Sequence, residues 1–230
     1  MRIAVLGTGM VGQAVAGKLA ELGHDVVVGT RDPEATLART EPDFLGNPPF
    51  RAWKQANPAV ALATPAAAAA HAELVVNASN GAGSIAMLDS AGEDNLSGNV
   101  LIDIAVPLDF SQGTPPSLFV SNTDSLGEQI QRRFPRSRVV KTLNTINCDV
   151  MVNPGKVPGD HDVFVCGDDA DAKHQVRELL QNFGWPAEHI VDLGDITSAR
   201  GTEMYVALWL RLWAALGTSH FNIAVMHGQA

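Results

Sequence analysis

The sequence predicts an α/β fold: a doubly wound, mainly parallel sheet of the Rossmann type, followed by a small C-terminal α+β region that ends in a long helix. Two observations predict this fold. A glycine-rich loop, GTGMVG at 7–12, directly follows a short apolar run and precedes a helical pattern. After it, apolar strand-like runs alternate with helical segments, which is typical of parallel sheets covered by helices.

The first 29 residues read as a complete β-α-β unit. Ile3–Leu6 is an apolar strand, and a helix with one apolar face follows the glycine loop. That face comprises Val11, Val15, Leu19 and Leu22. Gly23 is a suitable C-terminal cap, and a second buried strand is predicted at 25–29. This order of elements is the setting that a dinucleotide-binding glycine loop requires.

The remaining elements continue the alternation. A short helix (33–39) is followed by a proline-rich excursion that Phe50 and Trp53 are expected to anchor. The later strands are predicted at 60–63, 74–78, 100–106, 139–143, 162–166 and 189–193, and the later helices at 65–72, 124–134, 170–182 and 198–216. The best candidate boundary divides a dinucleotide-binding domain, 1–152, from a small C-terminal domain, 153–230, which would hold the pocket of a second ligand and the dimer contacts.

The composition of the 230-residue chain limits its possible functions. Hydrophobic residues make up 46% and charged residues 18%, which favours a large core. The net charge of −9 argues against nucleic acid or an anionic membrane as the main partner. The most apolar segment, 204–216, is interrupted by Arg211 and is shorter than the ~20 residues that cross a bilayer. We therefore expect a cytoplasmic protein without a signal peptide, whose Cys148 and Cys166 are free thiols.

The glycine loop predicts a pyrophosphate site. Gly7 permits a tight turn, Gly9 lets the backbone approach the ligand, and Gly12 lets the helix pack close to the strand. The first-turn N–H groups would face the anion at the favourable end of the helix dipole. The predicted contacts are Gly7, Thr8, Gly9, Met10, Val11 and Gly12. The alternative is a glycine turn that binds no ligand.

The end of the second strand indicates NADP rather than NAD. NAD sites place Asp or Glu there, whereas this strand ends in Gly29-Thr30-Arg31. The Thr30 hydroxyl and the Arg31 guanidinium suit a 2′-phosphate. Alternatively, Arg31 is a solvated loop residue and Asp32 a turn residue before Pro33.

Two further strand ends are expected to face the same cleft. The small residues Ala78, Ser79 and Asn80 would let the dinucleotide cross the sheet edge, although Gly81 could mark an ordinary turn with Ser84 capping the next helix. Ala105, Val106 and Pro107 would form an apolar wall beside the nicotinamide, and a buried strand end of any function has the same character.

The chain offers no convincing acid–base or metal constellation, so no catalytic residue and no metal ligand are predicted. His24, His71 and His174 are interpreted as structural or solvent-facing, and Asp168-Asp169 as a helix cap. Two sets of charges stay open. Either Arg200 pairs with Glu203 one helical turn away, or Ser198 or Arg200 contacts a ligand. The basic cluster is either solvated surface or a site for a polyanionic cofactor tail. The basic cluster comprises Arg132, Arg133, Arg136, Arg138 and Lys141.

Beyond the glycine loop, longer segments resemble the F420-dependent NADP oxidoreductase family, the NADPH-dependent reductases of coenzyme F420. The resemblance extends over nearly the whole chain. The segments that carry it are HDVVVGTRDPEA (24–35), VVKTLNTIN (139–147), DVFVCGDD (162–169) and LGDITSARGTE (193–203). It implies that Thr30 and Arg31 take the 2′-phosphate, and that the turn with Asn144 and Thr145 lines the pocket of the second cofactor.

The resemblance implies an oxidoreductase that transfers a hydride between NADP(H) and the deazaflavin of coenzyme F420. Such transfer needs stacked rings in a dry site and no protein nucleophile. The Asn144-Thr145 form is also similar to the reductase domain of membrane ferric reductases, which passes hydride to a flavin. FMN or FAD, a small carbonyl or imine substrate, and a non-catalytic NADP-binding redox sensor therefore stay open as alternatives. The apolar final helix predicts a homodimer.

Overall fold

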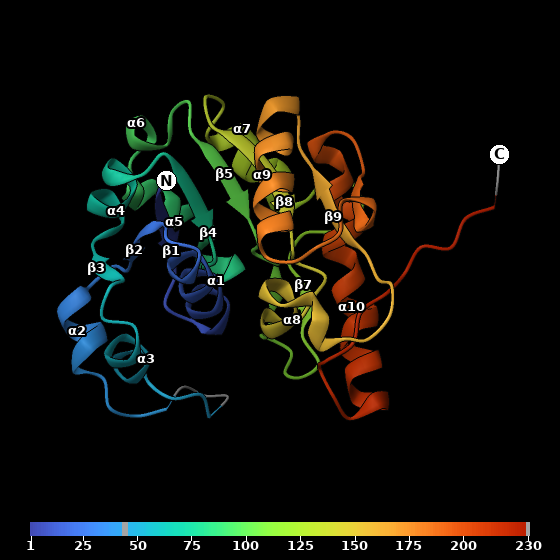
Figure 1. The fold of residues 1–230 in the computed structure, drawn as a ribbon, viewed down its shortest axis with the longest axis horizontal. Coiled ribbons are helices and arrows are strands. Elements are labelled where there is room, and N and C mark those ends of the chain that lie inside the picture. The colour runs from blue at the N-terminus through green and yellow to red at the C-terminus, as the bar shows by residue number, and fades with distance from the viewer. Residues whose placement is uncertain (43–45, 229–230) are drawn as a thin grey trace.

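Within residues 1–42 and 46–228, which the computed structural model describes, eight strands form one sheet in the order β10-β9-β8-β5-β4-β1-β2-β3 (Figure 1). Neighbouring strands are parallel except for β8 and β9, which pair antiparallel. The strands of the sheet are β1 (Arg2–Leu6), β2 (Asp25–Gly29), β3 (Ala61–Ala63), β4 (Leu74–Asn77), β5 (Val100–Asp103), β8 (Arg138–Thr142), β9 (Val163–Cys166) and β10 (Ile190–Asp192), and a separate hairpin joins β6 (Leu108–Asp109) to β7 (Ser117–Leu118). The predicted mainly parallel α/β fold is confirmed.

Helices cover both faces of the sheet. The described α-helices are α1 (Met10–Glu21), α2 (Pro33–Ala38), α3 (Phe50–Ala56), α4 (Pro65–His71), α5 (Ser84–Ala91), α6 (Glu93–Leu96), α7 (Leu126–Arg133), α8 (Cys148–Val152), α9 (Ala170–Asn182) and α10 (Ala199–Leu216). One core packs α1, α3, α8 and α9 on one face, and the other packs α4 to α7 and the start of α10 on the opposite face. None of the described helices combines the length and hydropathy needed to cross a membrane.

Alternation within β1 shows how one strand serves both cores. Ile3 and Val5 belong to the first core, and Ala4 and Leu6 belong to the second. All four side chains are fully buried, because a parallel strand covered on both faces must be apolar on both. The apolar runs that predicted the strands are therefore a direct consequence of the two helical layers.

Local caps place the helix starts close to where the sequence predicts them. Asp32 accepts a hydrogen bond from Ala35 N ahead of α2, Thr64 caps α4, and Asp169 caps α9. Gly23 follows α1 with a φ of 82°, as expected of a residue just past a helix. Phe50 is buried and its ring centroid lies 5.2 Å from that of Trp53, so both aromatics anchor the excursion as expected.

The fifth strand of the sheet is shorter than predicted. β5 ends at Asp103 and not at Val106, because the Asp103 carboxylate accepts a hydrogen bond from Ala105 N and turns the chain. The interpretation that Ser84 caps α5 is wrong. Gly83 is the N-cap residue of α5, and the buried Ser84 hydroxyl accepts a hydrogen bond from Asn77 instead. β9 and β10 belong to the same sheet as the glycine loop's strand, and the division at residues 152 and 153 stays a prediction.

Candidate functional site

The predicted site residues follow five parallel strands that end at one edge of the sheet. In spatial order these strands are β8, β5, β4, β1 and β2, and their carboxyl ends face the same way. In open α/β sheets ligands bind outside this edge, where the chain order of the strands reverses. Here the reversal falls between β1 and β4. The edge therefore offers a continuous path from Thr30 after β2 to Asn144 after β8.

A cleft of about 580 Å³ opens at the end of this edge formed by β1, β2 and β4. Eight predicted residues line it: Gly7, Thr8, Gly9, Thr30, Arg31, Ala78, Ser79 and Asn80. Met10, Val11 and Gly12 lie in the first turn of α1, whose N-terminus no side chain caps. Its first-turn N–H groups therefore have no partner within the helix, which is the condition for binding an anion.

The three glycines of the loop have different structural roles. A Cβ on Gly12 would overlap the carbonyl oxygen of Gly7, so α1 could not approach β1 with a side chain there. Gly7 has a φ of 129°, and a Cβ on it would meet the backbone of Ala78 after β4. At Gly9 a Cβ would meet no described atom within 4 Å. The open space at Gly9 fits a ligand that approaches the backbone.

The far end of the cleft carries two arginines. Thr30 is almost fully buried and its hydroxyl lies 3.0 Å from that of Thr36, whereas Arg31 is exposed. Arg39, just past α2, also lines the cleft and was not predicted as a site residue. The signal available in the sequence was that only a short helix separates Arg39 from the end of β2, so its side chain stays close to Arg31. Asp32, interpreted from the sequence as a turn residue, instead caps α2 by accepting a hydrogen bond from Ala35 N.

The loops after β4 and β5 are in close contact. A Cβ on Gly81 would overlap the carbonyl oxygen of Val106, so glycine permits this approach. Ala105 and Pro107 are buried and Val106 is partly buried, which gives the predicted apolar wall. These three residues lie beside the cleft and outside its lining.

The turn after β8 is strained and holds an unsatisfied polar group. Leu143 has a φ of 63°, an uncommon value for a residue with a side chain. Asn144 and Thr145 are buried, and Asn144 Nδ2 has no hydrogen-bond partner among the described residues. A buried amide without a partner is costly, so this atom fits a ligand group that accepts a hydrogen bond.

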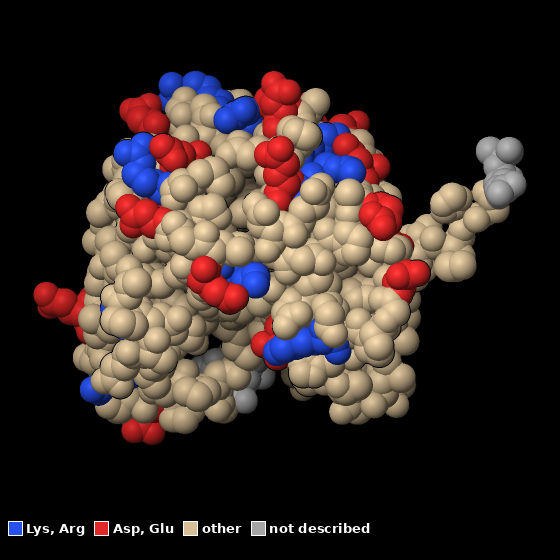
Figure 2. Space-filling view, viewed as in Figure 1, with Lys and Arg blue, Asp and Glu red and all other residues tan. Residues whose placement is uncertain are grey.

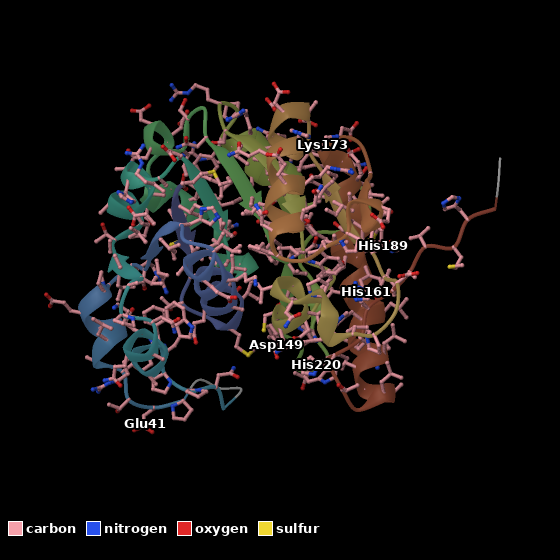
Figure 3. All side chains as sticks on the ribbon, in the orientation of Figure 1. Glu41, Asp149, His161, Lys173, His189 and His220 are labelled. Atoms are coloured by element: carbon pink, nitrogen blue, oxygen red, sulfur yellow. The ribbon has the colours of Figure 1, made fainter. Side chains whose placement is uncertain are left out.

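The C-terminal segment after α10 closes around this turn. Asn147 donates to the Ser219 hydroxyl at 3.1 Å, and His220 contacts the Asp149 carboxylate at 3.0 Å (Figure 3). His220 and Lys156 together hold the pKa of Asp149 below its usual value, chiefly through the His220 hydrogen bond. These contacts fix the start of α8 next to the buried turn.

The basic cluster is divided among carboxylates and the core. Arg132 pairs with Asp124, Arg133 with Asp89, and Arg136 with Asp94. In Figure 2, blue and red atoms lie close together along the top of the molecule, near α6. Lys141 is completely buried. The interpretation of the basic cluster as solvated surface therefore holds for the three paired arginines. It is wrong for Lys141, which lies in the core.

The predicted pairing of Arg200 with Glu203 is wrong. Arg200 binds Glu128 at 2.6 Å, whereas Glu203 points into the core and contacts Lys141 at 2.8 Å. Residues three positions apart share a helix side, but each finds a partner on another element here. The Arg200 hydrogen bond holds the pKa of Glu128 below its usual value.

The remaining titratable groups of the described residues include free thiols and helix-end carboxylates. No three or more His, Cys, Asp or Glu side chains among the described residues are placed to hold a metal ion. Cys148 and Cys166 are free, and burial raises the pKa of the Cys166 thiol to about 12. Asp169 caps α9, and Asp168 accepts a hydrogen bond from Ile196 N.

Comparisons with known proteins give related reductases. Residues 2–107 match the family described as NADP oxidoreductase coenzyme F420-dependent. A solved structure from Arthrobacter sp. FB24, of a candidate F420-dependent NADP-reductase, is 58% identical with a TM-score of 0.94, covering 99% of this chain and 100% of that one. The F420-dependent NADP reductase of Methanothermobacter marburgensis is 28% identical over 92% of both chains.

The chain is also similar to part of a longer protein. It is 26% identical to the rat (Rattus norvegicus) metalloreductase STEAP3 over 212 residues, which are 92% of this chain and 38% of that protein. The match to the Arthrobacter structure, with 58% identity and nearly complete coverage of both chains, is much stronger than the match to STEAP3. It agrees with the family match, which includes the glycine loop. The chain belongs to the family of coenzyme F420-dependent NADP oxidoreductases.

Proposed function

We propose that this protein transfers a hydride between NADP(H) and the deazaflavin of coenzyme F420. The observation that carries the proposal is the common edge of the sheet, with a nucleotide-sized cleft at the β2 end and a buried, unpartnered amide at the β8 end. Family membership supports both cofactors. When bound, the two rings supply the donor and acceptor carbons, and the chain has to bind and orient them.

The cleft suits NADP in its charge and its shape. Gly7, Gly9 and the N-terminus of α1 would take the pyrophosphate, and Thr30 and Arg31 the 2′-phosphate. In the described part of the chain, no carboxylate is paired with Arg31, so its guanidinium is free to bind phosphate oxygens in a bidentate manner.

The acceptor would lie between the loop after β5 and the turn after β8. The Ala105–Pro107 wall would exclude water from one side, and Asn144 and Thr145 would hydrogen-bond the polar edge of the ring. The unpartnered Nδ2 of Asn144 supports this assignment, because a carbonyl of the ring would satisfy it. Orientation and dryness are what such a reaction needs from the protein.

Stopped-flow mixing with NADPH tests the reaction. We expect F420 to be reduced faster than FMN or FAD in parallel runs. Thr145→Trp should block acceptor reduction and leave NADPH binding nearly intact, whereas Thr145→Ser, which keeps the hydroxyl, should retain most of the activity. Preferential reduction of FMN or FAD would move the assignment to a flavin reductase. Turnover of a carbonyl or imine substrate with no deazaflavin or flavin reduced would reject the proposal.

We also infer that two copies associate through α10. Four of its large apolar side chains are exposed: Met204, Leu208, Trp213 and Leu216. Leu208 and Leu216 are 54% and 56% exposed, and a second copy related by a two-fold axis would bury part of this apolar surface. Sedimentation should give a dimer at micromolar concentration, and Leu208→Glu should shift it to monomer. A wild-type monomer under these conditions would contradict the inference. The expected cytoplasmic location stays a prediction.

A further inference from the structure

A completely buried ion network lies below the proposed nicotinamide position. The Lys141 ammonium on β8 contacts Asp103 at the end of β5 and Glu203 on α10, each at 2.8 Å. The side chains of Lys141 and Asp103 are fully inaccessible, and that of Glu203 is nearly so. The same ammonium donates a hydrogen bond to the carbonyl oxygen of Ala105. Lys141 thus joins three elements and the first residue of the apolar wall.

The network continues into the nucleotide cleft. The second oxygen of Asp103 accepts hydrogen bonds from Asn77 Nδ2 at 2.8 Å and from Ala105 N at 3.2 Å. The oxygen of the Asn77 amide accepts a hydrogen bond from the Ser79 hydroxyl at 2.7 Å. Ser79 lines the cleft. Both loops that would flank the nicotinamide are therefore tied to the Lys141–Asp103 pair.

The other end of the network is held by a helix N-terminus. Glu203 accepts hydrogen bonds from Leu126 N at 2.8 Å and Gly127 N at 3.0 Å, in the first turn of α7. Two carboxylates and one ammonium leave a net negative charge, which the positive end of the α7 dipole offsets. Burial lowers the pKa of Lys141, but the attraction of Asp103 and Glu203 outweighs it and keeps the ammonium charged.

Stability alone does not account for such a network. Replacing a buried ion cluster with well-packed apolar side chains is often neutral or stabilising, because desolvation offsets the attraction between the charges. What apolar side chains could not do is bond the carbonyl of Ala105 and orient Asp103 toward Asn77. These directional contacts fix the two loops relative to each other, in addition to the close packing at Gly81.

We propose that Lys141 is a positioning residue for hydride transfer: through Ala105 directly, and through Asp103 and Asn77 to Ser79, it holds the two loops that set the place of the nicotinamide ring. This inference rests on the proposed function, because the position of the nicotinamide ring is taken from it. Lys141 touches neither cofactor. Its effect should therefore fall on the nicotinamide half of the dinucleotide and spare the adenine half, which lies at the β2 end.

The test compares NADP⁺ with 2′,5′-ADP, a fragment that lacks the nicotinamide. In Lys141→Met we expect the ratio of the two dissociation constants, NADP⁺ over 2′,5′-ADP, to rise about tenfold, together with a drop of about tenfold or more in the rate of hydride transfer from NADPH. In Lys141→Met two buried carboxylates would lose their cation, so this variant could fail to fold. The double variant Lys141→Met/Glu203→Gln, which removes one of the two negative charges, is therefore measured as well and can be tested in its place.

Arg200→Met is the matched control. It removes an ion pair between α10 and α7 without touching Lys141, so it should leave the ratio unchanged. An unchanged ratio in a folded Lys141 variant would overturn the proposal, and so would equal weakening of both ligands, which indicates a general loss of structure. If the wild-type protein reduces no F420 while the ratio still responds, the acceptor assignment fails and the positioning role stands.

Discussion

Arg31→Ala should weaken the preference of this protein for NADPH over NADH by about tenfold. Arg31 lies at the end of β2, is exposed and lines the nucleotide cleft. The neighbouring Thr30 is buried and bonded to Thr36, so it cannot replace the lost charge. The substitution removes a guanidinium from an exposed position, and we expect the fold to stay intact.

The exposure of Arg31 sets the expected magnitude. A hydrogen bond to a charged group contributes about 1.5–3 kcal/mol. Solvent and salt screen exposed charges, so we expect the lower end, ~1.5 kcal/mol. That value corresponds to a rise of about tenfold in the Michaelis constant for NADPH. Arg39, which lines the same cleft, can retain part of the phosphate contact and limits the loss further.

Initial rates with NADPH and NADH at constant acceptor concentration measure the effect. The Michaelis constant for NADH should change little, because NADH carries no 2′-phosphate. The NADPH effect should shrink as the ionic strength rises. Arg138→Ala is the control, since Arg138 starts β8 at the opposite edge of the sheet and contacts the Gly98 carbonyl. Equal losses for NADPH and NADH would refute the assignment of Arg31 to the 2′-phosphate.

Three further outcomes are expected. Gly9→Ala should keep the melting temperature but weaken NADPH binding in titrations, because a Cβ at residue 9 meets no described atom and points into the space for the ligand. Gly12→Ala should lower the melting temperature, because its Cβ would overlap the backbone of Gly7. Equal melting temperatures for the two variants would contradict this prediction. The Asp162 hydrogen bond raises the pKa of His189 above 6.5, so this stabilisation is complete below pH 6.5 and is lost as the pH rises through the folded pKa. His189→Gln should therefore lower the melting temperature at about pH 6 and hardly at about pH 9, and a pH-independent effect would refute the linkage. With a pKa of about 12, the Cys166 thiol should resist iodoacetamide in the native protein at neutral pH, and rapid alkylation detected by mass spectrometry would count against its burial.

The sequence by itself determined the fold class and the family, and it predicted the strand ends at which the proposed site lies. Continuous apolar runs such as β1 are what a strand covered on both faces requires, and the glycine loop follows that strand directly. A helix limit could be predicted where a cap is local, as at Asp169, because a cap bonds within three residues. The segment 139–147 carried the family resemblance, and the comparisons confirm it.

Only the tertiary structure decided which charges meet. Lys141 belongs to a basic run in the sequence, yet it lies in the core between Asp103 and Glu203, which are 38 residues before it and 62 after it in the chain. Arg200 and Glu203 have the spacing of a helical pair, but the tight packing of α10 against α7 points one to Glu128 and the other inward. Ion pairs between residues so far apart in the chain depend on how the helices pack on the sheet. The periodicity of one segment shows which side of a helix a charge lies on, but not which residue of another element will lie opposite it.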